Sequence, residues 1–175
     1  MTAVYKGLIA LPETRFLAVG MMMPWENNLE AQFGFWREMK ENGTVDRLRE
    51  HCGGGEVAGL FCYRCDMEKR VFSYHIACEK KRDVLPGPFE AMTLKGLDYA
   101  RFEDVCAARE ERFATYERLC GAFWEQWLPA SRYVSLIEPE TGACLPGFAA
   151  VERFQPEIPL GACRMEMLFP VRKKP

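Results

Sequence analysis

The second half of this chain repeats the order of elements found in its first half. In each half a strand-like apolar run precedes a helix-like stretch, and two more strand-like runs follow it. The first set is 15–20, the helix around Phe35-Trp36, 57–65 and 71–78. The second set is 97–102, the helix around Phe123-Trp124, 147–154 and 163–171. A β-α-β-β unit used twice predicts a pseudo-twofold α+β fold, with an antiparallel sheet, two main helices and a ligand groove between the units.

The two units are expected to form a single domain over residues 1–175. A chain of 175 residues is long enough for one domain with a full core. The connection at 80–88 holds two prolines and a glycine, and it is short, so the halves should pack closely. We therefore place the first repeat at about 1–85 and the second at about 86–175.

Charge and hydropathy narrow the choice of partners. The net charge is −2 and the charges are scattered, whereas a nucleic-acid surface needs a basic stripe that neutralises phosphates. No apolar run is long enough to cross a bilayer, and the N-terminus lacks a signal-peptide pattern. The sequence therefore predicts a soluble cytoplasmic protein that binds neither nucleic acid directly nor a membrane.

The chain has eight cysteines, most of them inside apolar segments. A reducing cytosol argues against a disulfide framework. Cys62 and Cys65 form the only CxxC pair, and on a strand their odd spacing points them to opposite faces. A zinc site with His51, Cys52, His75 or Cys78 is the alternative, but small buried thiols are favoured. We expect no metal and no cofactor.

Glu152 is the sharpest local signal for chemistry. It lies in the run 148–154, where strand alternation puts it on the same face as Phe148, Ala150 and Phe154. A carboxylate among aromatic and small residues is costly to bury without a partner. Such a group can form the floor of an aromatic pocket that attracts a cation, or it can act as a general base on water.

Two structural interpretations of Glu152 stay open beside the functional ones. Its face of the strand could be solvated, or Glu152 could pair with an arginine such as Arg101 or Arg164. Glu166, in a strand rich in methionine and aromatic residues, is a second and weaker carboxylate candidate.

The aromatic residues offer candidate walls for a pocket. Trp36 and Trp124 occupy matching helices, where core packing is the commoner role. Further aromatic candidates are Trp25, Tyr63, Tyr74 and Tyr99. The two histidines, His51 and His75, have no serine or cysteine arrangement typical of a catalytic triad.

Several short motifs, taken in order, resemble a known family. The second half contains Tyr99-Ala-Arg-Phe102, a helix ending in Trp127-Leu-Pro129, then Val151-Glu-Arg-Phe154 and the closing run 167–171. The first half contains an aromatic-x-Tyr strand at 72–79, before the turn Pro86-Gly87. This order is similar to the GyrI-like small-molecule-binding domain, also called the AraC-type effector-binding domain. The likeness covers nearly the whole chain.

The resemblance implies a central pocket whose acidic residue is Glu152. The expected ligand-binding residues are Glu152, Trp36, Tyr74, Trp124, Phe154, Tyr99 and Phe148, with Glu152 as the catalytic candidate. Some family members are the ligand-sensing parts of multidrug-responsive transcription regulators. Others stand alone, among them gyrase inhibitors and hydrolases that open cyclopropane-bearing compounds, and this chain resembles that stand-alone group.

The chain also departs from the family pattern. Phe154 stands where the Glu-x-Tyr motif has its tyrosine, and Leu168 stands at the usual tyrosine of the last strand. Three functions follow as hypotheses. The first is binding of amphipathic, aromatic small molecules, with cations as one option among them. The second is hydrolysis of a strained electrophile by a water that Glu152 activates. The third is a protein-interaction role such as gyrase modulation, which has no direct support in the sequence.

Overall fold

The computed structural model describes residues 3–26, 28–138, 145–156, 159 and 161–175. Nine strands are found in these residues. They are β1 (Val4–Leu11), β2 (Thr14–Pro24), β3 (Val57–Asp66), β4 (Val71–Glu79), β5 (Glu90–Leu94), β6 (Leu97–Cys106), β7 (Tyr133–Ser135), β8 (Ala150–Gln155) and β9 (Cys163–Lys173). All their pairings are antiparallel, so the predicted α+β fold with an antiparallel sheet is confirmed.

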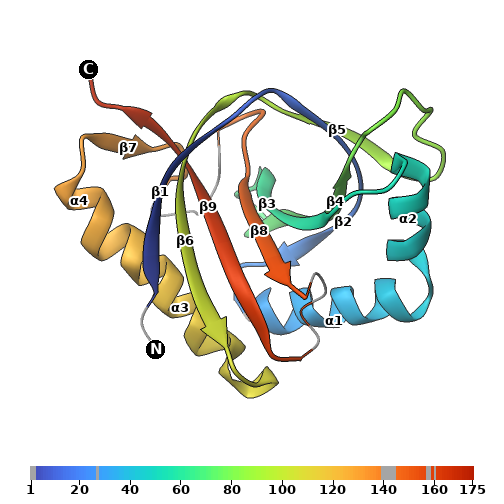
Figure 1. The fold of residues 1–175 in the computed structure, drawn as a ribbon, viewed down its shortest axis with the longest axis horizontal. Coiled ribbons are helices and arrows are strands. Elements are labelled where there is room, and N and C mark those ends of the chain that lie inside the picture. The colour runs from blue at the N-terminus through green and yellow to red at the C-terminus, as the bar shows by residue number, and fades with distance from the viewer. Residues whose placement is uncertain (1–2, 27, 139–144, 157–158, 160) are drawn as a thin grey trace.

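The strand order shows how the two halves fit together. It runs β1-β6-β9-β8-β3-β4-β2-β5, with β7 paired to β9 outside this path (Figure 1). If β1 to β4 are matched with β5, β6, β8 and β9, the order reads the same from either end. β3 and β8 meet at the centre, and the first strand of each half pairs with the second strand of the other half. The boundary between the repeats at about residue 85 stays a prediction.

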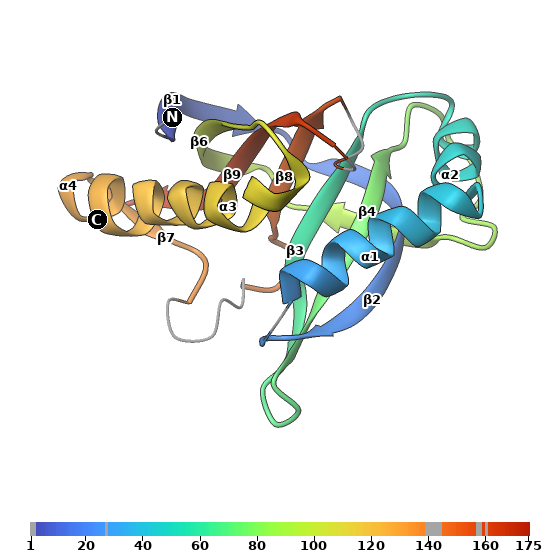
Figure 2. The ribbon, with the colours of Figure 1, turned by 90° about the horizontal axis from the view of Figure 1, so that it is seen from below.

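The helices are unequal in the two halves. The first half has α1 (Asn28–Glu41) and α2 (Thr44–Cys52). The second half has the short 3-10 turn η1 (Arg109–Glu111), α3 (Arg112–Gly121), the π-helical turn η2 (Ala122–Trp127) and α4 (Leu128–Ala130). The helix expected around Phe123-Trp124 is therefore a composite, and its π-helical turn carries these two residues. Figure 2 shows α1 and α3 passing in front of the strands.

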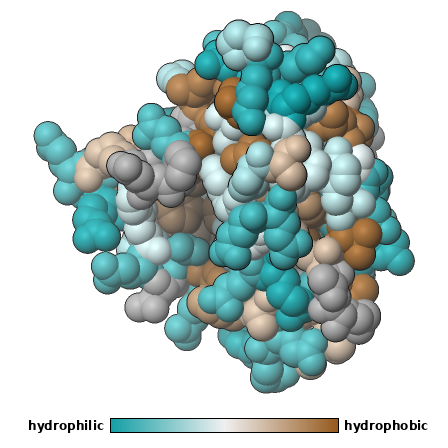
Figure 3. Space-filling view, turned by 90° about the vertical axis from the view of Figure 1, so that its left-hand side faces the viewer, coloured by the Kyte–Doolittle hydropathy of each residue, from teal (hydrophilic) through white to brown (hydrophobic). Residues whose placement is uncertain are grey.

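The sheet buries apolar side chains on both faces. Alternate residues of the strands pack with Trp36, Leu48 and Phe123 of the helices in the larger core cluster. The opposite face carries a smaller cluster that includes Leu60 and Tyr99. Hydrophilic residues cover much of the side seen in Figure 3, and hydrophobic residues show between them. Among the described residues, no helix is long and apolar enough to cross a membrane.

The predicted strand at 147–154 begins later than expected. Residues 145–148 form a turn, in which the backbone N–H of Phe148 donates to the carbonyl oxygen of Leu145 and Gly147 has a φ of 87°. β8 starts only at Ala150, so the alternation that placed Phe148 beside Glu152 does not extend to Phe148.

Candidate functional site

Glu152 lies at the centre of the sheet, where the two halves meet. Its strand neighbours are Gly59 on β3 and Met167 on β9, and its side chain is 1% exposed. A Cβ atom at position 59 would lie 2.2 Å from the hydroxyl oxygen of Tyr74 and 2.8 Å from Oε2 of Glu152. Glycine at 59 is therefore what leaves room for the carboxyl group above the neighbouring strand.

Neutral donors surround one oxygen of this carboxyl group. Oε2 accepts hydrogen bonds from Nε2 of Gln32 at 2.6 Å and from the hydroxyl of Tyr74 at 3.0 Å. The Tyr74 hydroxyl oxygen accepts in turn from Nε1 of Trp36 at 2.7 Å. The Trp36 ring lies edge-on to the ring of Phe154, with centroids 5.8 Å apart. Side chains from α1, β4 and β8 thus form one buried network.

Among the residues that the structure describes, no cation pairs with Glu152. Oε1 is buried and has no hydrogen-bond partner among the described residues. Arg101, one of the two arginines considered as partners, instead pairs with Glu166 and Glu103. Burial raises the pKa of Glu152 to about 8, although the hydrogen bonds from Tyr74 and Gln32 act to lower it. At neutral pH the carboxyl group is therefore mostly protonated.

A cavity of about 260 Å³ lies beside this network. Its lining residues are Trp25, Asn28, Phe61, Cys62, Phe72, Tyr116, Cys120, Trp124, Ile137, Ala150, Met167 and Phe169. Ala150 precedes Glu152 by two residues on the same strand face. The ring of Phe61 lies against that of Tyr74, at 4.8 Å between centroids. Glu152 itself is not among the residues that line the cavity.

Irregular backbone shapes the wall of this cavity. The β3–β4 register shifts between Phe61 and Cys65, and Cys62 has a φ of 61°. Trp124 comes from the π-helical turn η2. Bulges and π-helical turns of this kind are frequent beside binding sites, because they redirect side chains.

The structure brings four of the predicted site residues into contact and places the others elsewhere. Glu152, Trp36, Tyr74 and Phe154 form the network, and Trp124 lines the adjoining cavity. Tyr99 packs in the smaller cluster on the opposite face of the sheet. Phe148 lies under the ammonium group of Lys95, which is 5.5 Å from the ring centroid.

Sequence reasoning missed Gln32, Gly59 and the cavity lining residue Tyr116. A signal for Gln32 was present, since it lies on the buried stripe of α1 between Leu29 and Trp36 and is a polar residue there. A buried amide on such a stripe indicates a polar partner across the core.

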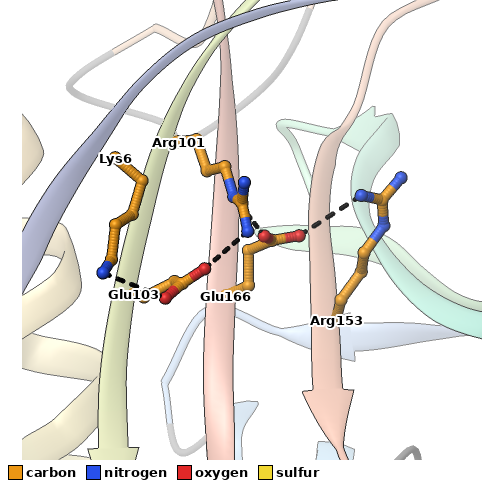
Figure 4. A network of polar contacts seen from close by, with 5 residues as sticks. All are labelled: Lys6, Arg101, Glu103, Arg153 and Glu166. Carbon is orange, nitrogen blue, oxygen red and sulfur yellow. Dashed lines mark hydrogen bonds and ion pairs between the residues drawn. The ribbon is translucent and has the colours of Figure 1, made fainter.

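The second carboxylate candidate, Glu166, lies in a different electrostatic setting. On the opposite face of the sheet it pairs with Arg101 and with Arg153, the latter at 3.3 Å (Figure 4). Arg101 also bridges to Glu103 at 2.5 Å, and Glu103 pairs with Lys6 at 3.4 Å. These charges compensate one another along strands β1, β6, β9 and β8, beside a second cavity of about 510 Å³.

The cysteines form no evident metal centre in the described part of the chain. Those described are free thiols, and no cluster of three or more potential metal ligands is found among the described residues. Cys144 lies outside those residues. Because Cys62 sits at the β3 irregularity, the simple alternation assumed for Cys62 and Cys65 does not apply there.

Comparison with known proteins shows which family the chain belongs to. The sequence profile of Cass2, described as an integron-associated effector binding protein, matches residues 8–171. The chain belongs to this family. The GyrI-like resemblance seen in the sequence is thereby confirmed. None of the curated protein sequences matches the chain.

Several solved structures share the fold of this Cass2 family member. SAV2435 bound to tetraphenylphosphonium has a TM-score of 0.68 at 15% identity, over 97% of this chain and 94% of that one. A putative bacterial transcription regulation protein from Staphylococcus aureus MU50 has a TM-score of 0.64 at 18% identity, over 97% and 98%. The integron cassette protein VCH_CASS2 of Vibrio cholerae has a TM-score of 0.58 at 12% identity, over 97% and 99%.

Proposed function

We propose that this Cass2 family member binds amphipathic aromatic cations in the cavity beside Glu152 and neutralises them with that carboxylate. The observation that carries the proposal is a fully buried carboxyl group with one oxygen that has no hydrogen-bond partner, and with no cation beside it, among the described residues. A buried carboxyl in this setting stays neutral until a positive charge arrives. The same carboxyl is then the natural counter-ion of a cationic ligand.

The wall of the cavity suits the rest of such a ligand. Phe61, Phe72, Tyr116, Trp124 and Phe169 offer ring faces and edges to an aromatic molecule. A cation held near aromatic rings gains from the ring quadrupoles in addition to the carboxylate charge. Both repeats contribute under this proposal, the first with the network donors of α1 and β4, and the second with the acid of β8. We expect the ligand to be the direct partner, without direct contact between this chain and nucleic acid.

Binding requires the wall to open, because Glu152 does not border the cavity. Tyr116 and Cys120 of α3 line the cavity. Burial raises the pKa of both side chains, and the negative charge of Glu152 adds to this effect. Displacement of such a wall residue would join the cavity to the carboxyl group. Ligand binding of this kind selects an open conformation over the closed one.

Two ions of nearly the same shape and opposite charge test the proposal. Tetraphenylphosphonium, the ligand of the neighbour SAV2435, is titrated into the protein at about pH 8, and tetraphenylborate is titrated in parallel. Quenching of tryptophan fluorescence and calorimetry report the binding. We expect the cation to bind at least tenfold more tightly than the anion. Equal affinities, or no binding of the cation, would contradict a role for Glu152 as counter-ion.

A further inference from the structure

The tryptophan N–H groups of the chain are not equally satisfied. Nε1 of Trp36 donates to the Tyr74 hydroxyl, and the side chain of Trp127 forms a hydrogen bond with Tyr5. Nε1 of Trp25 is buried and has no partner among the described residues. A buried donor without an acceptor is costly, and native proteins rarely keep one without a reason.

Trp25 is also one of the residues that line the cavity beside Glu152. Its backbone is held on both sides. The backbone N–H donates to the carbonyl oxygen of Arg70 at 3.2 Å, and the backbone carbonyl accepts from Nδ2 of Asn28 at 2.7 Å. These bonds fix the segment between β2 and α1. The indole is therefore positioned by backbone contacts, while its N–H group stays unpaired.

Two other polar groups of the cavity wall are engaged. The amide nitrogen of Asn28 bonds to Trp25, and the hydroxyl of Tyr116 is hydrogen-bonded to Cys120. The Trp25 N–H is buried rather than exposed to the cavity, so a ligand would reach it only when the wall opens, but it could then satisfy this donor without breaking a hydrogen bond found among the described residues. Its complement on the ligand is a hydrogen-bond acceptor.

We propose that Trp25 selects, among aromatic cations, those that carry a neutral hydrogen-bond acceptor such as a carbonyl or ether oxygen. This inference rests on the proposed function and narrows its ligand class. The ligand would place its positive charge toward Glu152 and its acceptor toward the indole N–H of Trp25. Because an unpaired polar group is left behind when the acceptor is missing, such a site discriminates more strongly than an apolar wall of the same shape.

Matched ligands separate this inference from the proposed function. The 4-acetylphenyl and 4-isopropylphenyl derivatives of triphenylphosphonium have similar bulk and the same charge, but only the first carries an acceptor. We expect the wild-type protein to bind the acetyl derivative about tenfold more tightly, the usual scale for satisfying one buried donor. In Trp25→Phe, which removes the N–H group and keeps an aromatic ring, this preference should disappear. The matched control is Trp127→Phe, which removes an indole N–H that bonds to Tyr5 and is not part of the cavity lining, and which should retain the preference.

The possible outcomes are distinct. If wild type binds both derivatives equally, or if the preference survives in Trp25→Phe, the role of Trp25 is wrong while cation binding stands. If neither derivative nor tetraphenylphosphonium binds, the proposed function itself fails. The comparison of the two derivatives on the wild-type protein needs no variant. It therefore still tests the proposal if the Trp25→Phe protein does not fold. A ligand-induced shift of the Trp25 indole N–H resonance, seen only with the acetyl derivative, would be the direct signature of the bond.

Discussion

Glu152 and Glu166 lie on neighbouring strands and face opposite sides of the same sheet, in contrasting surroundings. Glu166 contacts two guanidinium groups, those of Arg101 and Arg153. Glu152 contacts only an amide and a phenol, and no arginine or lysine pairs with it among the described residues. One face of the sheet therefore balances its carboxylates internally, and the other face keeps a carboxyl group that lacks a counter-ion.

The difference teaches which of the two acids is available for a ligand. A carboxylate already bound by arginines gains little from another cation, and extracting it would leave the arginines unpaired. A buried carboxyl group with a raised pKa has no counter-ion. A cation that binds beside it supplies one and thereby stabilises the ionised form. Burial without compensation, rather than the presence of a carboxylate, marks the candidate site.

The largest expected effect comes from Glu152→Gln. This change keeps the size and the hydrogen-bond acceptor of the side chain but removes its ability to become charged. We expect the affinity for tetraphenylphosphonium at about pH 9 to fall by about 3 kcal/mol, roughly a hundredfold, as for loss of a buried charge partner. Calorimetry on the purified variant measures it.

The same variant distinguishes the functional hypotheses. If Glu152→Gln binds the cation as tightly as wild type, Glu152 is not the counter-ion, and the proposed difference between Glu152 and Glu166 is wrong. If instead binding persisted while turnover of a cyclopropane-bearing compound was lost, the hydrolase hypothesis would gain the support that it lacks.

The second effect concerns Gly59, whose missing side chain leaves room for the buried carboxyl group of Glu152. In Gly59→Ala the new Cβ would lie 2.2 Å from the Tyr74 hydroxyl oxygen, and relief requires the network to move. We expect the free energy of unfolding to fall by about 2 kcal/mol, in the range for overpacking a core. Gly34→Ala is the control, because position 34 is on α1 with no atom within 4 Å of its Cβ, so alanine should stabilise the helix slightly. Urea denaturation compares both variants, and equal effects would show that the central strands tolerate the extra methyl group.

The third effect is a pH dependence of stability and of cation affinity, and we expect it to arise from Glu152 on the face that packs against the helices. The pKa of Glu152 is about 8 in the folded protein against an ordinary value of 4.5, so the folded state binds the extra proton between those values. The free energy of unfolding should therefore fall as the pH rises from about 4.5 to 8, by at most about 1.4 kcal/mol per pH unit. Over the same window, affinity for a permanent cation should rise by up to about tenfold per unit, since the bound form is ionised.

Urea denaturation and calorimetry at a series of pH values give both slopes. Glu152→Gln should remove this contribution to each of them. A wild-type affinity that is flat between pH 6 and 8 would mean that the carboxyl group either is ionised without a ligand or takes no part in binding.

The sequence predicted more of the fold than of the candidate site. Repeated element order predicted the sheet, and strand alternation placed Glu152 on the same face as Phe154, because both depend on local hydrophobic patterning. The same patterning could not say which face of β6 turns toward the helices, and Tyr99 lies on the other face. The placement of Phe148 failed for a local reason, since the turn at 145–148 delays the start of β8.

The cavity itself had no signature in the sequence. It arises where both halves pack together, at the register shift near Cys62 and at the π-helical turn that carries Trp124. Both features depend on tertiary contacts that override regular hydrogen bonding. The unpaired N–H of Trp25 belongs to the same class, because satisfaction of a donor can be judged only when its surroundings are known.

The smallest effect is expected on the compensated face. Glu166→Gln removes the carboxylate that Arg101 and Arg153 share, but both arginines are more than a third exposed and water can solvate them. We therefore expect the free energy of unfolding to fall by about 1 kcal/mol or less, and the loss should shrink in high salt. Cation affinity should be unchanged, because this network lies on the other face of the sheet from Glu152. Denaturation in low and high salt, together with one tetraphenylphosphonium titration, checks all three expectations. A large loss of cation affinity in Glu166→Gln would mean that the two faces are coupled through β8 and β9, and that the carboxyl groups act together.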